Sequence, residues 1–228
     1  MVNNSPQDEL VVGVLLYDNC MMLDLVGPTT YLELLGLIGV KVRFLTISYK
    51  TGHVQESHLV PLVATTHFKD APTKLDILVI PGAKDTTEVE ANEEYIAYVR
   101  EAAANATFVL SVCTGATLLA SAGALDGRRA TTNKMAFRHV AAKYPGVQWV
   151  QRARWVVDGE KWWTSSGVAA GLDMGHAFIA ARYGREVADA MARVIEIVPN
   201  TDADEDPFAS CVDDKQFFTE LLAKHQAK

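Results

Sequence analysis

The 228-residue sequence has few cysteines, no cluster of basic side chains and no long apolar run. Its three cysteines, Cys20, Cys113 and Cys211, are odd in number and far apart, which argues against a disulfide framework and favours a reducing compartment. The net charge of −7 and the scattered Lys and Arg residues argue against a nucleic-acid surface, because no basic patch would replace the counterions of the phosphates. No apolar run reaches the roughly 18 residues that span a membrane.

The polar N-terminus, residues 1–9, also lacks the apolar core of a signal peptide. We therefore expect a cytoplasmic protein with no nucleic-acid or membrane partner. The sequence contains neither a GxGxxG pattern nor a phosphate-binding loop, and its histidines match no metal-ligand spacing. These absences predict a protein with no cofactor and no bound metal.

The composition is that of a folded chain, because 49% of its residues are hydrophobic. The length suits one α/β domain with a sizeable core. We expect that core to cover about residues 10–199. An acidic break and a C-terminal helix are predicted for residues 200–228.

The stretch of residues 107–116, TFVLSVCTGA, joins a predicted buried strand to a predicted helix, which Gly123 would end in the left-handed conformation. Cys113 therefore lies at a sharp turn from strand to helix. There, the partial positive charge of the helix N-terminus would favour the thiolate, and free amides of the first turn would bind an oxyanion. The alternative is a buried cysteine without chemistry.

Strands and helices alternate along the first half of the chain. The apolar runs that predict strands are residues 10–17, 41–48, 75–80 and 107–113. This alternation predicts a parallel sheet with helices on both faces, in which ligands bind beyond the carboxyl ends of the strands. Asp24 follows the first of these strands, Gly82 follows the third and Cys113 ends the fourth, so we expect the three to meet in one site.

Asp24 lies inside the apolar run MMLDLV, and the next helix is predicted to begin at Pro28, a favoured first helical residue. One interpretation is a capping carboxylate bonded to backbone amides. The other is a buried carboxylate whose raised pKa lets it hold and pass a proton. The apolar flanks favour the second interpretation.

The C-terminal half carries fewer candidate residues. The four tryptophans and His176 are expected to serve packing. The acidic residues 201–206 are predicted to form a solvated linker. The amphipathic residues 213–225, which include Phe217 and Phe218, are expected to pack on the body or on a second subunit.

Five motifs together resemble the DJ-1/PfpI superfamily. They are LDLVGP at residues 23–28, DILVIPGA at 76–83, SVCTGA at 111–116, LDGRRATT at 125–132 and SGVAAGLD at 166–173. The resemblance covers about residues 10–199. It implies a flavodoxin-like three-layer sandwich with a mostly parallel sheet, a cysteine nucleophile elbow and, usually, a homodimer.

Within the superfamily, the first and third motifs look most like isocyanide (isonitrile) hydratases and the amidase-like domains of AraC-type regulators. The resemblance implies that Cys113 is the nucleophile, that Asp24 handles protons and water, and that Thr114 contacts the substrate. The residues implied to line a small-molecule substrate are Gly82, Gly115 and Val168, with Gly82 supplying an amide to an oxyanion pocket.

The chain departs from many relatives at Asn133, where they have a histidine. This weakens a Cys–His pair and any glyoxalase-like or deglycase-like activity that depends on it. Hydration of an isocyanide to an N-substituted formamide, through a thioimidate on Cys113, does not need that histidine. A third hypothesis is a cysteine-oxidation sensor or protective binding protein without turnover.

Overall fold

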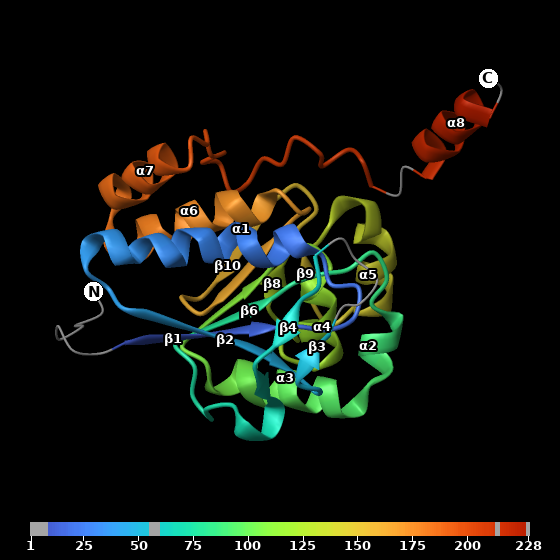
Figure 1. The fold of residues 1–228 in the computed structure, drawn as a ribbon. Coiled ribbons are helices and arrows are strands. Elements are labelled where there is room, and N and C mark those ends of the chain that lie inside the picture. The colour runs from blue at the N-terminus through green and yellow to red at the C-terminus, as the bar shows by residue number, and fades with distance from the viewer. Residues whose placement is uncertain (1–8, 55–59, 213–214, 227–228) are drawn as a thin grey trace.

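In a computed structural model that describes residues 9–54, 60–212 and 215–226, a seven-stranded sheet crosses the molecule (Figure 1). The strands in spatial order are β10 (Trp155–Asp158), β11 (Trp162–Ser165), β7 (Phe108–Ser111), β6 (Ile77–Ile80), β1 (Leu10–Leu15), β2 (Val42–Ser48) and β5 (Thr66–His67). All neighbouring strands are parallel except the β10–β11 hairpin. The predicted mostly parallel sheet is confirmed.

The central strands are apolar on both faces because helices cover both sides of the sheet. Every residue of β6 and β7 is buried. In Figure 1, α1 (Met22–Glu33), α6 (Ala170–Tyr183) and α7 (Arg185–Val194) lie on one side, and α3 (Glu93–Asn105) lies on the other. α3 packs on α4 (Gly115–Ser121). This arrangement is the three-layer α/β sandwich that the sequence predicts.

Shorter elements complete the described part of the chain. They are η1 (Leu34–Ile38), β3 (Gly52–His53), β4 (Val63–Ala64), η2 (Phe68–Asp70), α2 (Thr87–Ala91), β8 (Arg129–Ala130), η3 (Lys134–Ala136), α5 (Phe137–Lys143), β9 (Gln148–Trp149) and α8 (Lys215–Gln226). None of the helices among these described residues is long and apolar enough to cross a bilayer.

The predicted start of the first helix is wrong. α1 begins at Met22 and Pro28 lies inside it, with Asp24 in its first turn. The residues before Gly27 join the helix because one side of it is buried, where Asp24 has no exposed surface and Leu25 is only 4% exposed. Burial of this face outweighs the local preference of proline for the first helical position.

The prediction of a solvated linker at residues 201–206 is also wrong in one respect. Asp206 is buried and forms ion pairs with Lys134 and Arg154, so the packed part of the chain extends beyond residue 199. Further along, Leu221 and Leu222 of α8 are exposed, and Figure 1 shows this helix apart from the body. The residues 213–214 and the side chains of Phe217 and Phe218 lie outside the described residues.

The expected packing roles of the aromatic residues agree with the structure. Trp155, Trp162 and Trp163 are buried, and Trp163 meets Phe178 edge to face. His176 is buried in α6 and hydrogen-bonds Asp189 of α7 over 2.9 Å, which ties these two helices together.

Two glycines where α1 meets α6 give a test of this packing. A Cβ on Gly175 would lie 3.0 Å from the buried Tyr31 ring and 3.3 Å from the Cα of Pro28, whereas a Cβ on Gly27 would make ordinary contacts with Leu172 at 3.5 Å. Both changes to alanine gain helix propensity, but only one overpacks the interface. We expect Gly175→Ala to be about 1–3 kcal/mol less stable than Gly27→Ala in urea denaturation. Equal stabilities would show that the interface relaxes freely.

Candidate active site

Cys113 lies two residues beyond β7, in the turn that leads into α4. Its φ of 59° is left-handed, a conformation that costs energy for any residue with a side chain. The turn is secured on both sides, because the Cys113 amide donates to the carbonyl of Ser166 over 2.9 Å and its carbonyl accepts from the Thr132 hydroxyl over 2.9 Å. The side chain is thereby directed to the carboxyl edge of the sheet, where it is 5% exposed.

Two glycines let the backbone close around this turn. A Cβ on Gly115 would lie 2.3 Å from the carbonyl oxygen of Ile80, and a Cβ on Gly82 would lie 2.5 Å from the Thr114 amide nitrogen. Neither backbone has room for a side chain. The loop after β6 and the start of α4 therefore lie in direct contact.

Asp24 reaches this contact from α1. Its Oδ2 accepts the Gly82 amide over 2.9 Å, while its Oδ1 is buried and has no hydrogen-bond partner. Met21, not Asp24, occupies the N-cap, so the capping interpretation does not apply. Burial raises the pKa of Asp24 to about 6, and the Gly82 amide and the Cys113 thiol oppose that rise. The structure thus brings Asp24, Gly82 and Cys113 together.

The expected thiolate at Cys113 is not what the resting structure favours. Burial, followed by repulsion from Asp24, raises the pKa of the thiol to about 12. The Thr114 amide, the Asn133 side chain and the Thr114 hydroxyl all lower it, but by less. The dominance of burial means that Cys113 rests as a thiol beside a carboxyl group.

Two groups that were predicted to contact the substrate, the Thr114 hydroxyl and the Gly82 amide, already hydrogen-bond other residues of the chain. The Thr114 hydroxyl donates to the Ala83 carbonyl over 2.7 Å and accepts the Ala83 amide over 2.9 Å, so its proton is committed. The Gly82 amide is likewise committed to Asp24 in this structure. Both the amide and the hydroxyl of Thr114 lower the pKa of the Cys113 thiol, and of the two it is the hydroxyl that also bonds Ala83.

The other two predicted lining residues frame the turn. The Gly115 amide donates to the Val112 carbonyl over 2.9 Å, which leaves this residue a packing role. Val168 is half-buried in the connection from β11 to α6, two residues after Ser166, whose carbonyl holds the Cys113 amide.

Asn133 is a site residue that the sequence analysis did not nominate. Its Oδ1 accepts the amides of Met135 and Ala136 at the start of η3, which leaves Nδ2 as the donor that faces the Cys113 sulfur. The signal was present in the sequence, as the departure from histidine after the ATT motif. An amide at this position donates a hydrogen bond without titrating.

A cavity of about 500 Å³ lies at the β1–α1 turn. Its lining includes Cys20, Met21, Met22 and Val89. The backbone of Cys20 forms an isolated antiparallel β-bridge with Ala83. Burial raises the pKa of Cys20 to about 11. Among the described residues, no group of three or more His, Cys, Asp or Glu side chains is arranged to hold a metal ion.

Comparison with known proteins gives a consistent result. An isonitrile hydratase of Pseudomonas putida is 32% identical over 190 residues, 83% of this chain and 79% of that protein. A deglycase of Pyrococcus horikoshii is 33% identical over 135 residues, which cover 55% of this chain and 73% of its own.

The crystal structure of a ThiJ/PfpI family protein from Pseudomonas syringae has the same fold, with a TM-score of 0.77 and 25% identity over 97% of this chain and 90% of that one. The sequence model of the DJ-1/PfpI family matches residues 11–181, which include the Asp24, Gly82 and Cys113 segments. The chain therefore belongs to the DJ-1/PfpI family.

Proposed function

We propose that this protein is an isocyanide hydratase, which adds water to a small isocyanide to give an N-substituted formamide. The observation that carries the proposal is a buried carboxyl group with one unpartnered oxygen and a pKa near 6, beside a buried thiol. A single carboxyl group of this pKa can both accept and return a proton near neutral pH. The similarity to a hydratase over most of both chains supports the same reaction.

The first half of the reaction forms a thioimidate. Because the free thiol has a high pKa, its proton moves to Asp24 as the sulfur attacks the terminal carbon of the isocyanide, and not before. The new S–C bond places an electron pair on that carbon, and Asp24 delivers its proton there. Asp24 returns to the carboxylate, and the carbon is now bonded to sulfur, hydrogen and nitrogen.

The second half releases the product. Asp24 removes a proton from a water molecule that attacks the thioimidate carbon and passes this proton to the nitrogen, which gives the tetrahedral intermediate. Asp24 then takes the proton of the new hydroxyl group as the carbonyl forms and the C–S bond breaks. The N-substituted formamide leaves, and the thiolate regains its proton from Asp24. The Thr114 amide and the Asn133 Nδ2 face the sulfur and stabilise its negative charge as it leaves.

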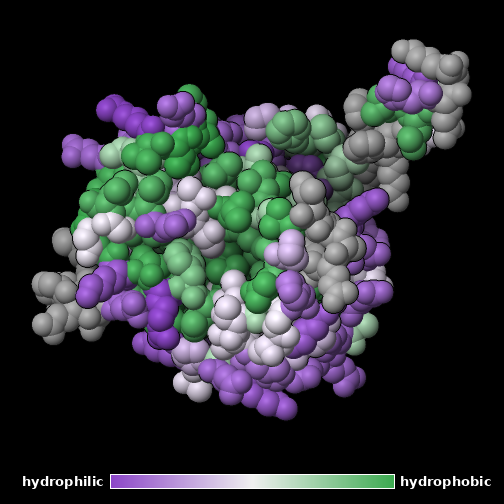
Figure 2. All heavy atoms as spheres, in the orientation of Figure 1, coloured by the Kyte–Doolittle hydropathy of each residue, from purple (hydrophilic) through white to green (hydrophobic). Residues whose placement is uncertain are grey.

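We further propose that two copies of the chain associate through α1. Figure 2 shows apolar atoms gathered on the face where α1 lies, and the exposed fractions of Leu23 and Val26 are 40% and 46%. The same helix carries Asp24 on its buried side. A second copy on this face would therefore lie close to the candidate site.

Turnover is the first test of the proposed reaction. We expect steady-state hydration of p-nitrophenyl isocyanide, followed by absorbance, to fall by at least about 1,000-fold in Cys113→Ala, because the nucleophile is lost. Asp24→Asn should lose about 100-fold to 10,000-fold. Cys211→Ala is the matched control and should keep full activity.

The proposal fails if the folded wild type shows no turnover of p-nitrophenyl isocyanide. Assays with methylglyoxal and then with peroxide would in that case separate a carbonyl-handling enzyme from an oxidation sensor. Similarity to a deglycase makes methylglyoxal the first of the two.

The pH dependence follows from Asp24. The first step needs its carboxylate form, so kcat/KM should decline as the pH falls through about 6. The folded chain binds this proton more tightly than the unfolded chain, so stability should decrease as the pH rises from about 4 to 6. Asp24→Asn should abolish both effects, as measured by pH–rate profiles and by urea denaturation at several pH values. If the decline of kcat/KM at low pH persists in Asp24→Asn, the titrating group is not Asp24.

Association through α1 is testable by light scattering. Val26→Glu places a charge on the apolar face, and we expect it to convert the dimer to a monomer at micromolar concentration. Leu222→Glu, at a still more exposed leucine of the distant α8, is the control and should leave the mass unchanged. A wild type that is monomeric at every concentration would contradict the proposed dimer.

A further inference from the structure

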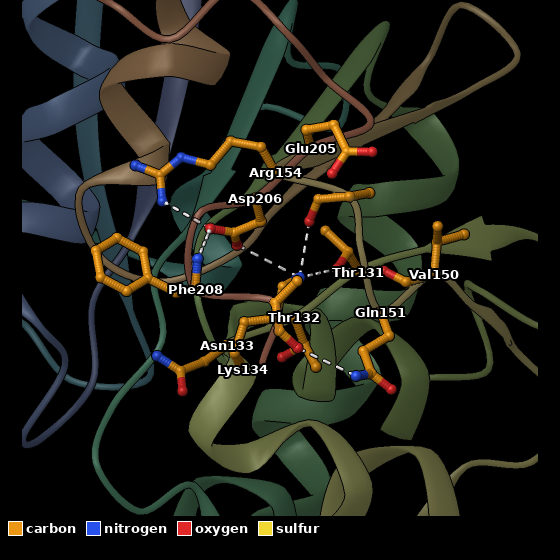
Figure 3. Close-up of polar contacts among 12 residues, drawn as sticks. Thr131, Thr132, Asn133, Lys134, Val150, Gln151, Arg154, Glu205, Asp206 and Phe208 are labelled. Carbon is orange, nitrogen blue, oxygen red and sulfur yellow. Dashed lines mark hydrogen bonds and ion pairs between the residues drawn. The ribbon is translucent and has the colours of Figure 1, made fainter. Parts of the chain in front are cut away.

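The segment after α7 brings a buried carboxylate back to the body of the protein. The side chain of Asp206 has no exposed surface. Its Oδ1 accepts the Phe208 amide over 3.0 Å and lies 3.4 Å from Nη1 of Arg154. Its Oδ2 lies 3.6 Å from Nζ of Lys134 and accepts no hydrogen bond. Figure 3 shows Lys134 and Arg154 both pointing toward this carboxylate.

Lys134 connects this carboxylate to one side of the Cys113 turn. Its Nζ donates to the Thr131 hydroxyl over 2.9 Å and to the Ala153 carbonyl over 2.7 Å, and it is 3% exposed. The intervening residues are Thr132, whose hydroxyl bonds the Cys113 carbonyl, and Asn133, whose amide faces the sulfur. The ammonium group thus ties both ends of the 131–134 stretch, which carries the two contacts, to the Ala153 carbonyl.

Arg154 connects the same carboxylate to the other side. Its Nε donates to Asp173 over 2.8 Å, and its amide donates to the Ala203 carbonyl over 2.8 Å. Its own carbonyl accepts the Ser166 amide, and the Ser166 carbonyl accepts the Cys113 amide, each over 2.9 Å. The contacts that lead from Asp206 through Lys134 and through Arg154 therefore both end at Cys113. Each reaches either the backbone of Cys113 or a group that faces its sulfur.

We propose that Asp206 is a positioning residue for Cys113, acting through Lys134 to hold the Thr132–Asn133 backbone against the turn. The inference rests on the proposed function for its catalytic consequence. The C-terminal segment then forms part of the catalytic apparatus although it touches neither the thiol nor Asp24.

A purely stabilising role would not require these charges. Replacing a buried ion pair by apolar side chains is often neutral or favourable for stability. The four charges in the cluster, those of Lys134, Arg154, Asp173 and Asp206, balance one another. What an apolar pair would lack is the two hydrogen bonds from Lys134, to the Thr131 hydroxyl and the Ala153 carbonyl, which tie residues 131–134 to the neighbouring segment.

The ionisation of Lys134 gives this arrangement a pH signature. The charged groups that face it are Asp206 from the C-terminal segment and Arg154 beside β10. Thr131, the Ala153 carbonyl and the Phe137 ring are its uncharged neighbours. Burial lowers the pKa of Lys134 to about 8, and Asp206 opposes that fall. Above this pH the ammonium group loses its attraction for Asp206.

The test compares Asp206→Asn with Glu205→Gln, a neighbouring change of the same charge at an exposed carboxylate that pairs with Arg152. We expect kcat for p-nitrophenyl isocyanide to fall about tenfold in Asp206→Asn, with KM changed less than twofold, because the reacting groups are misplaced. In the pH–rate profile of kcat, the alkaline limb of the wild type is expected near pH 8. In Asp206→Asn this limb should move to lower pH. Glu205→Gln should match the wild type in all three measurements.

A second variant covers the case in which Asp206→Asn does not fold. In Lys134→Met/Asp206→Leu the charge pair is removed as a unit, and we expect a melting temperature close to the wild type. Its kcat should still fall about tenfold and its alkaline limb should disappear. A folded double variant with the wild-type kcat would overturn the inference.

A readout without substrate separates this inference from the proposed function. The side-chain amide signals of Asn133, assigned by their loss in Asn133→Asp, should titrate near pH 8 in NMR spectra of the wild type and at lower pH in Asp206→Asn. This result without isocyanide turnover would retain the positioning role and reject the hydratase. Signals that do not titrate would reject the positioning role whatever the enzyme does.

Discussion

The hydrogen bond from the Gly82 amide to Asp24 Oδ2 is the constraint on which the site depends. It holds a carboxyl group from α1 against the loop after β6, and leaves the second carboxyl oxygen buried without a partner beside Cys113. The close approach requires glycine at position 82, and the Thr114 hydroxyl secures the facing loop through both polar groups of Ala83. The raised pKa of Asp24 follows from this burial.

Burial has opposite consequences for the two groups that we propose to react. It brings the pKa of Asp24 towards neutrality, where the carboxyl group exchanges protons readily, and it takes the pKa of Cys113 away from neutrality. A thiol that stays protonated at rest is protected from oxidation and from adventitious electrophiles. In the reaction that we propose, reactivity then depends on a substrate whose carbon accepts the proton that the thiol gives up.

The sequence was sufficient for the features set by local pattern. Apolar runs predicted the strands, and the rule that ligands bind beyond the carboxyl ends of parallel strands predicted that Asp24, Gly82 and Cys113 would meet. The sequence was insufficient for features that depend on residues far apart in the chain. The start of α1 depends on a face buried against the sheet, and the burial of Asp206 depends on Lys134 and Arg154, which no spacing in an acidic stretch reveals. The donor role of Asn133 depends on which of its two amide atoms η3 uses.

The left-handed backbone of Cys113 has a consequence for how this position can change. A glycine there would adopt the same φ without steric cost, and an asparagine nearly so, whereas cysteine carries a penalty of about 1–2 kcal/mol. The neighbouring bonds to Ser166 and Thr132 are made by the backbone and do not depend on the side chain. A descendant that no longer needed the thiol would thus gain stability by losing it, and a cysteine retained here is retained against the preference of the fold.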